Sequence, residues 1–263
     1  MTLSSLMGLR AFTVYNRFDH LIMTKLLYLS NSYVKEFKAN VLEVSGKGYL
    51  RLDCTAFYPG GGGQPFDLGT IHYADTKYNV VKMIRQNNVI WHVVDGVCTL
   101  GVGQAVKGII DWELRYKLMR THTAMHILCG VVWRDYGAKV TGGNMSPLRA
   151  RMDFEFESMH AALVQEIEEK INLEVNASRD ILVEIVPREE AFQIPDLIRT
   201  KINLLPKGIR EVRTVEIVGL DLQADGGTHV ANTSEVGIIK VVDYKSKGRI
   251  NKRIVVEIGE SNN

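Results

Sequence analysis

The sequence predicts an α+β protein in which a small N-terminal β-barrel precedes a domain of antiparallel sheet and helices. Two observations support this prediction. Short alternating or β-branched runs, separated by Gly, Asn and Asp, fill the chain from residue 25 to about 107. Helical periodicity begins at Trp112 and is followed by further strand patterns. The change near Asp111 therefore divides the chain into a barrel at 23–108 and an α+β domain at 109–263.

The second domain is defined by three patterns. Apolar residues recur at three-, four- or seven-residue intervals from 112 to about 136, which predicts an amphipathic helix. The stretch 149–156 alternates strictly between apolar and polar residues, as a half-buried strand does. Residues 159–178 carry apolar residues four apart, so a second helix is expected to pack on this sheet. Further strands are expected at 181–187, 212–220, 236–245 and 253–259.

Bulk composition is that of an ordinary globular protein, with 263 residues and 24% charged side chains. The net charge of +2 permits binding to a polyanion but is low for a duplex-binding protein, so we expect no DNA partner. The three cysteines form no CxxC pair, which disfavours a disulfide framework and favours a cytoplasmic location. No apolar run approaches the ~20 residues of a membrane span, and we expect no membrane partner.

The first 22 residues lack the uninterrupted apolar core of a signal peptide. A second methionine, Met23, stands just before the patterned sequence begins. We expect residues 1–22 to be an upstream extension and Met23 to be the physiological start. The alternative is that these residues add a strand or a helix to the fold.

Two histidines on the first predicted helix suggest half of a metal site. His122 and His126 are four residues apart, so both rings project from one helix face, about 40° apart around the axis. Such a pair also arises by chance in helix packing. Residue 123 is threonine, so the glutamate of an HExxH peptidase is missing. Cys129 lies on the same side, but it also falls on the apolar stripe, where free cysteine is commonly a buried small hydrophobe.

The segment DGGTH, residues 225–229, suggests the other half. Asp225 and His229 bracket a Gly-Gly turn between predicted strands. Glycines accept positive φ, so the turn is expected to bring the flanking side chains together. Zinc takes three or four ligands in a tetrahedron. A helix pair and a turn pair would therefore form a closed or nearly closed zinc site from His122, His126, Asp225 and His229.

These motifs together resemble a known family. HxxxH on a helix, followed later by a GGTH turn, is similar to the editing domain of alanyl-tRNA synthetases and to the free-standing alanyl-tRNA editing proteins, the AlaX group. The segment LDCTAFYPGGGGQPFDLGTI at 52–71 resembles the glycine-rich element of the medium-length members. The segments at 111–128, 149–156 and 225–254 resemble the helix entry, the following strand and the C-terminal block of that family.

The resemblance implies a trans-acting editing hydrolase that binds one zinc ion. Its substrate would be mischarged tRNA(Ala), from which it would hydrolyse the ester at the 3′ end, chiefly of serine and also of glycine. The chain has no room for the aminoacylation module of the synthetase, which favours a free-standing factor. Two alternatives are an RNA-binding module with a purely structural zinc ion and a metal-dependent hydrolase of another small ester.

One residue departs from the family pattern. Many members have cysteine where this chain has Asp225. A carboxylate is a legitimate zinc ligand at ~2.0–2.2 Å. Asp225 therefore either binds zinc directly, which we favour, or orients one of three ligating histidines.

Selective hydrolysis of the serine ester requires a polar group near the zinc helix. Serine adds one hydroxyl to alanine, and a site that hydrogen-bonds this hydroxyl discriminates far better than an apolar pocket. Thr141, after the first helix, is the first candidate, and Thr123 and Thr228 are alternatives. A turn or cap role is the simpler explanation for each threonine taken singly.

Contacts with the tRNA acceptor end are expected from a glycine run and from basic residues. Consecutive glycines allow close approach of a backbone and can cradle a phosphate, and the polar residues beside them add specificity. Recognition of shape and of the single-stranded end is expected, although a basic hairpin is more often a solvated loop. The candidates are Gly61, Gly62, Gly63, Gln64, Asp67, Arg120, Lys247, Arg249, Lys252 and Arg253.

Overall fold

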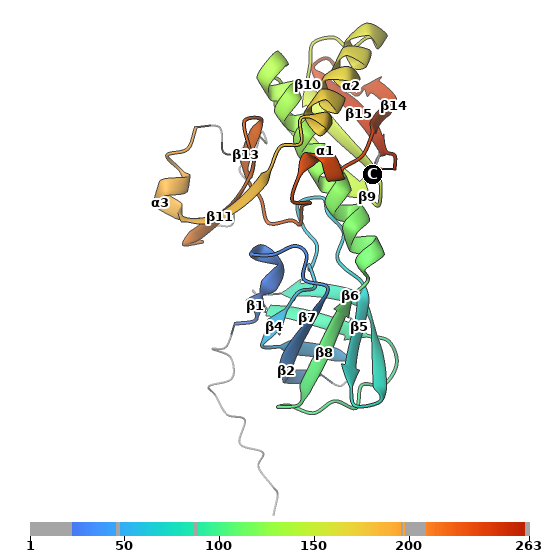
Figure 1. Ribbon diagram of the computed structural model, residues 1–263, viewed down its shortest axis with the longest axis vertical. Coiled ribbons are helices and arrows are strands. Elements are labelled where there is room, and N and C mark those ends of the chain that lie inside the picture. The colour runs from blue at the N-terminus through green and yellow to red at the C-terminus, as the bar shows by residue number, and fades with distance from the viewer. Residues whose placement is uncertain (1–22, 46–47, 87–88, 196, 198–208, 261–263) are drawn as a thin grey trace, which may run out of the picture.

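Six antiparallel strands close into a barrel in the N-terminal part of the chain, as the alternating pattern predicted (Figure 1). The computed structural model describes residues 23–45, 48–86, 89–195, 197 and 209–260. The expected upstream extension at 1–22 lies outside these described residues. Around the barrel the strands are, in spatial order, β2 (Glu36–Ser45), β3 (Tyr49–Leu52), β7 (Val89–Val94), β6 (Thr76–Gln86), β5 (Gly69–Tyr73) and β8 (Ala105–Ile110).

Inward-facing apolar side chains fill the barrel and explain its alternation. Phe37, Leu50 and Ile71 are among its buried residues. A short parallel pair and a 3-10 turn precede and flank it. These are β1 (Lys25–Leu26), η2 (Leu27–Leu29) and β4 (Cys54–Thr55).

Helix α1 (Trp112–Tyr136) leaves the barrel directly after β8 and runs along the long axis of the molecule (Figure 1). The Asp111 carboxylate caps its first turn by accepting from Leu114 N, and Gly137 ends it with a φ of 63°. The sequence predicted one apolar stripe, but every residue from 121 to 132 is buried. Of the helices in the described ranges, none is long and apolar enough to cross a membrane.

A four-stranded antiparallel sheet packs with α1 and α2 around the larger core. The order of its strands is β14-β15-β10-β9, so β9 lies at one edge and β14 at the other. This arrangement confirms the predicted antiparallel sheet with two main helices. The elements are β9 (Val140–Ser146), β10 (Arg149–Glu155), α2 (Ala161–Asn176), β14 (Ile239–Ser246) and β15 (Asn251–Ile258).

A second, three-stranded sheet leads into the DGGTH segment. Its strands pair in the order β11-β12-β13, and β13 ends one residue before Asp225. The sequence patterns did not indicate β13, which is only four residues long. The elements here are β11 (Ile181–Pro187), α3 (Arg188–Ala191), β12 (Glu211–Ile217), β13 (Asp221–Ala224) and η3 (Thr233–Glu235).

A buried ion pair joins the start of α1 to the barrel. Arg115 and Asp67 have no exposed side-chain surface, and both carboxylate oxygens of Asp67 accept from the guanidinium. Arg115 also donates to the carbonyl oxygens of Ser32 and Ala56, and Asp67 accepts from Tyr58 N at 2.5 Å. Asp67 was expected to contact tRNA. Its carboxylate is fully occupied inside the protein, so we assign it a structural role instead.

Replacing Asp67 by alanine would leave a buried guanidinium without its counter-ion. Breaking such a pair costs about 3–5 kcal/mol, so we expect Asp67→Ala to lower the free energy of unfolding by about this amount. Chemical denaturation measures it. Glu113→Ala is the control, because it removes an exposed pair with Lys117 on the same helix and should leave stability nearly unchanged. Equal effects of the two substitutions would contradict a structural role for the buried pair.

Candidate metal centre

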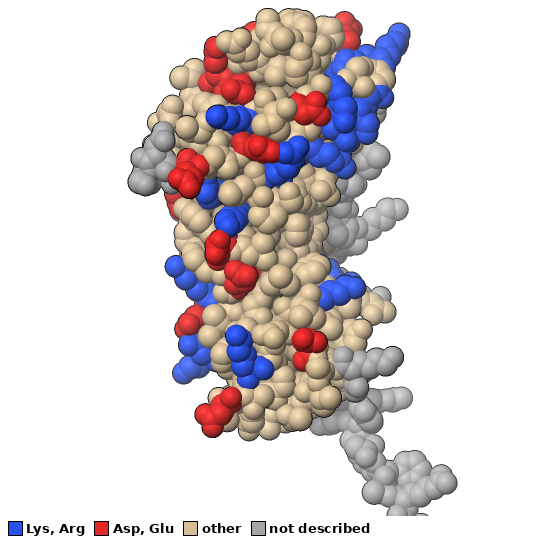
Figure 2. Space-filling view, turned by 90° about the vertical axis from the view of Figure 1, so that its right-hand side faces the viewer, with Lys and Arg blue, Asp and Glu red and all other residues tan. Residues whose placement is uncertain are grey.

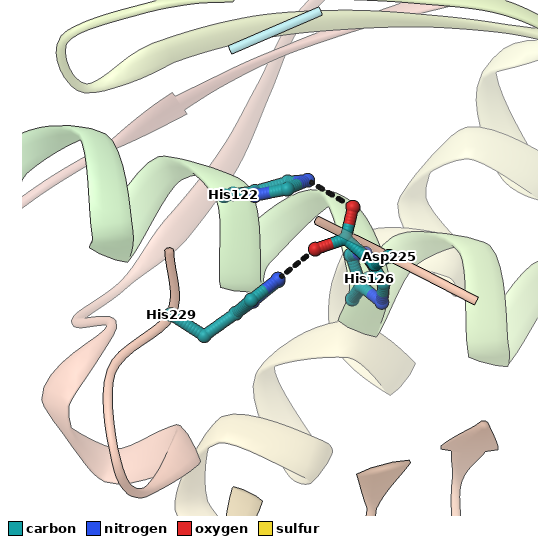
Figure 3. A group of neighbouring side chains, drawn as sticks. All are labelled: His122, His126, Asp225 and His229. Atoms are coloured by element: carbon teal, nitrogen blue, oxygen red, sulfur yellow. Dashed lines mark hydrogen bonds and ion pairs between the residues drawn. The ribbon is translucent and has the colours of Figure 1, made fainter. Parts of the chain in front are cut away.

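Four side chains that are distant in sequence converge beside the middle of α1 (Figure 3). The helix supplies His122 and His126, and the loop after β13 supplies Asp225 and His229. One ligand atom from each of the four lies within 4.8 Å of all the others. This group of four could hold a single metal ion.

The Asp225 carboxylate lies between two imidazoles at the edge of this group. Its Oδ2 is 3.0 Å from His229 Nε2, and its Oδ1 is 3.7 Å from His122 Nε2. The rings of His122 and His229 stack with centroids 4.2 Å apart, while His126 meets His229 edge-on at 4.6 Å. The histidines are nearly inaccessible, and the Asp225 side chain keeps 14% of its surface exposed. Solvent therefore reaches the group from the side of Asp225.

Steric demand explains the second glycine of the turn. A Cβ at Gly227 would lie 2.3 Å from Cε1 of His122, so no other residue fits there. The Gly227 N–H donates to Asp225 Oδ2 at 2.7 Å, which fixes the carboxylate. Neither Gly226 nor Gly227 is among the glycines with positive φ, so conformational freedom does not explain the pair. The turn needs glycine for space at 227.

Neighbouring polar groups orient the histidine rings. His126 Nδ1 donates to Asp221 Oδ2 at 3.2 Å, and the same oxygen accepts from Gln223 Nε2 at 2.6 Å. The Thr123 hydroxyl lies 3.2 Å from His229 Nδ1. Such partners fix the ring that carries the ligand nitrogen and raise its basicity. No motif in the sequence marks Asp221 or Gln223 as a partner of the histidines, although both stand in the DLQAD segment that leads into the turn.

Arg213 holds the turn from the other side. Its Nη1 donates to the backbone oxygen of Asp225 at 2.9 Å and lies 3.7 Å from Oδ2 of the same residue. Its Nε donates to the Leu29 carbonyl at 2.8 Å. The Arg213 side chain is 6% exposed, so a positive charge is buried beside the carboxylate. No sequence motif marked this residue, because it lies on β12, away from both motifs.

The local electrostatics favour the metal-binding protonation states of three of the four groups, namely the neutral imidazoles of His122 and His229 and the ionised carboxylate of Asp225. Burial lowers the pKa of His122 to about 4, and burial together with His122 lowers the pKa of His229. Burial alone would raise the pKa of Asp225, but His122 and His229 outweigh it and hold that pKa well below its usual range. Burial would also lower the pKa of His126, but Asp221 outweighs it and raises that pKa.

Four other residues near the predicted site have different surroundings. Cys129 is buried and accepts from Gln223 Nε2 at 3.4 Å, outside the four-residue group. Thr123 and Thr228 are fully buried with their hydroxyls engaged by protein groups. Thr141 is exposed on β9, at a register shift where Val140 and Gly142 pair with β10 but Thr141 has no partner. Its hydroxyl donates to Asn251 Oδ1 at 2.9 Å.

The basic candidates divide into internal and exposed residues. Arg120 donates to the carbonyl oxygens of Val236 and Gly259, and Lys252 donates to those of Gly248 and Arg249. Neither is placed as a free contact for tRNA. Arg253 pairs with Asp153 at 2.6 Å. Lys247 and Arg249 are exposed on the loop between β14 and β15.

Two family models match separate parts of the chain. The family described as "tRNA synthetases class II (A)" matches residues 3–114. "Threonyl and Alanyl tRNA synthetase second additional domain" matches residues 212–255, which contain the DGGTH turn. The alanyl-tRNA editing protein AlaX-M of Saccharolobus solfataricus is 40% identical over 236 residues, which cover 88% of this chain and 98% of that protein. This chain belongs to the AlaX-M family.

Other relatives support the assignment. The AlaX-M protein of Methanosarcina acetivorans is 37% identical over 239 residues, again 98% of its length. An alanine–tRNA ligase of Ignicoccus hospitalis is 39% identical over 228 residues, which make up 24% of that ligase. The similarity to the ligase is thus confined to one part of it, whereas the AlaX-M proteins match almost from end to end.

Zinc titration of alanine variants distinguishes a direct ligand from an orienting group. We expect Asp225→Ala to weaken zinc binding by more than about 100-fold and Asp221→Ala by about 10–100-fold, the range for a group that orients a ligand. Asp243→Ala, at an exposed position on β14, is the control and should bind as the wild type does. Unchanged zinc affinity in Asp225→Ala would rule out direct ligation.

Proposed function

We propose that the protein is a trans-editing hydrolase that removes mischarged amino acids from tRNA(Ala). The observation that carries this proposal is the four-residue group at the junction of two motifs, in a chain that matches AlaX-M proteins over 98% of their length. The reaction is hydrolysis of the ester between the amino acid and the terminal ribose. A cytoplasmic location follows from a role in translation.

The residues of the group fit a zinc ion. Three imidazoles and one carboxylate are a legitimate donor set for tetrahedral zinc. A zinc ion held here supplies a positive charge that polarises or orients groups beside it. His122, His126 and His229 would hold it from inside the protein, and Asp225 would hold it at the solvent side. If all four residues bind, the ion would mainly organise the site.

Serine is the principal amino acid that we propose the site removes, and glycine is the second. Recognition of serine requires a polar group that would be left unpaired by alanine. The hydroxyls of Thr123 and Thr228 are enclosed by protein partners, while Thr141 is exposed. A β-bulge commonly re-aims a side chain beside a site. We therefore keep Thr141 as the residue that contacts the serine hydroxyl.

We propose that the acceptor end of tRNA(Ala) approaches over the loop between β14 and β15. Figure 2 shows Lys and Arg side chains gathered at the end of the molecule away from the barrel. Lys247 and Arg249 are exposed on this loop. Asn251, just beyond the loop, contacts Thr141 on β9, and the backbone of β9 contacts the glycine loop at Gly63. These contacts link the basic loop, through β9, to the glycine loop that precedes Gln64.

Deacylation of tRNA(Ala) charged with serine, glycine or alanine tests the proposal. We expect the zinc-loaded protein to hydrolyse the seryl ester fastest, the glycyl ester more slowly and the alanyl ester at close to the uncatalysed rate. His122→Ala, which removes one ligand, should abolish hydrolysis. Binding of zinc and of tRNA without hydrolysis of the seryl or glycyl ester would instead support an RNA-binding module with structural zinc.

Removing the hydroxyl of Thr141 should affect selectivity more than folding. One lost hydrogen bond corresponds to about a 10-fold effect, so we expect Thr141→Val to lower kcat/KM for the seryl ester by about 10-fold. The glycyl ester, which has no hydroxyl to recognise, should be affected less. Thr76→Val on the barrel, another exposed strand threonine, is the control. Equal losses on both esters, or a parallel fall in Tm, would argue against serine recognition.

A further inference from the structure

The glycine loop of the barrel, residues 60–63, and the adjoining Gln64 form hydrogen bonds with β9 and with the DGGTH turn. Gly60, Gly61, Gly62 and Gly63 all have positive φ, so the chain turns back sharply, and Gly61 and Gln64 exchange backbone hydrogen bonds. The Gly63 carbonyl accepts from Met145 N on β9 at 3.2 Å. The loop therefore leaves the barrel and lies against the domain that holds the metal centre.

Both polar atoms of the Gln64 side-chain amide form hydrogen bonds with one residue of the DGGTH turn. Its Oε1 accepts from the Thr228 backbone N–H at 3.0 Å, and its Nε2 donates to Thr228 Oγ1 at 2.8 Å. Gln64 is 3% exposed and Thr228 is not exposed at all. Two hydrogen bonds to the main chain and the side chain of one residue define both its position and its orientation. A tRNA contact through this amide, as we first expected, would have to break them.

Thr228 lies between two parts of the metal centre. The residue after it is His229, and the residue before it, Gly227, lies against the His122 ring. A Cβ at Gly227 would also lie 2.7 Å from Gln64 Oε1. The backbone of Gly227 is therefore packed between the Gln64 amide and the His122 imidazole. Movement of the Gln64 amide must therefore displace the segment that carries one ligand and borders another.

We propose that Gln64 is a positioning residue for the metal centre, so that the barrel completes a site whose ligands all come from the other domain. This inference rests on the proposed metal site. A ligand nitrogen must be held within a few tenths of an ångström for tight binding. Gln64 supplies this precision at Thr228, one residue before His229. The metal affinity consequently depends on the docking of the barrel loop.

Substitutions at Gln64 distinguish the effect of its hydrogen bonds from the effect of its side-chain volume. Gln64→Met keeps the length of the side chain but leaves the buried Thr228 N–H without its acceptor. Gln64→Glu keeps an acceptor for that N–H, and the Thr228 hydroxyl can rotate to donate to the second carboxylate oxygen. Gln104→Met is a matched control, because Gln104 Oε1 likewise accepts a backbone N–H, from Gly101 at 2.8 Å, in another barrel turn.

Zinc affinity, measured by competition with a chromogenic chelator, tests the proposal alongside the Tm of the metal-free proteins. We expect Gln64→Met to bind zinc about 10–100-fold more weakly, as for loss of a group that orients a ligand. Gln64→Glu should stay within a few-fold of the wild type, and Gln104→Met should equal it. Adding Thr228→Val to Gln64→Met should change the affinity little further, since Gln64 acts through Thr228.

Wild-type zinc affinity in folded Gln64→Met would overturn the proposal, as would additive losses in the double variant. A fall in Tm without a change in affinity would show that Gln64 only stabilises the fold. The assay does not involve tRNA. Zinc binding by the wild type without hydrolysis of any aminoacyl-tRNA would therefore refute the proposed function and leave the role of Gln64 intact.

Discussion

The structure depends on the burial of three imidazoles and a carboxylate at one point beside α1. Polar groups removed from water destabilise a fold unless each finds a partner. The surrounding residues are arranged to provide these partners. Asp221 and Thr123 contact the outer nitrogens of two rings, and Arg213 places a positive charge beside Asp225. A cation at the centre of this cluster would complete the compensation, because its own charge would balance the buried acids.

The two parts of the molecule are joined by polar contacts as well as by apolar packing. Arg115 and Asp67 connect α1 to the barrel, and Gln64 and Thr228 connect the glycine loop to the DGGTH turn. Tyr33 adds a third connection through Glu235, at 2.7 Å. Buried polar contacts are direction-dependent and tolerate little sliding. The barrel is consequently held in one orientation relative to α1.

Local sequence patterns predicted the parts of the fold that local physics determines. The barrel strands follow from alternation, α1 and α2 follow from helical periodicity, and the His122–His126 pair follows from the helical repeat. Contacts between distant segments leave no such pattern. Gln64 and Thr228 are 164 residues apart, and Arg213 reaches Leu29 across 184 residues. These partners became evident only when the fold brought them together.

Residue type alone was misleading at several predicted tRNA contacts. Asp67 and Arg120 are charged and stand near the expected surface motifs, which favoured an exposed role. In the structure Asp67 is enclosed by the Arg115 guanidinium and Arg120 donates to backbone carbonyls at the other end of the chain. A charged residue that satisfies buried partners has the same appearance in a sequence as one that meets solvent. Conversely, the middle of α1 is more deeply buried than its polar residues suggested.

The composition of the metal group has a chemical consequence. Its donor atoms are nitrogen and oxygen, and Cys54, Cys98 and Cys129 all lie outside it. Peroxides and disulfides attack thiolates first, and a zinc site with a cysteine ligand loses its metal when that sulfur is oxidised. A centre built with Asp225 in place of sulfur offers such reagents no ligand to modify. The absence of a thiolate from these four side chains therefore depends on a single carboxylate, that of Asp225.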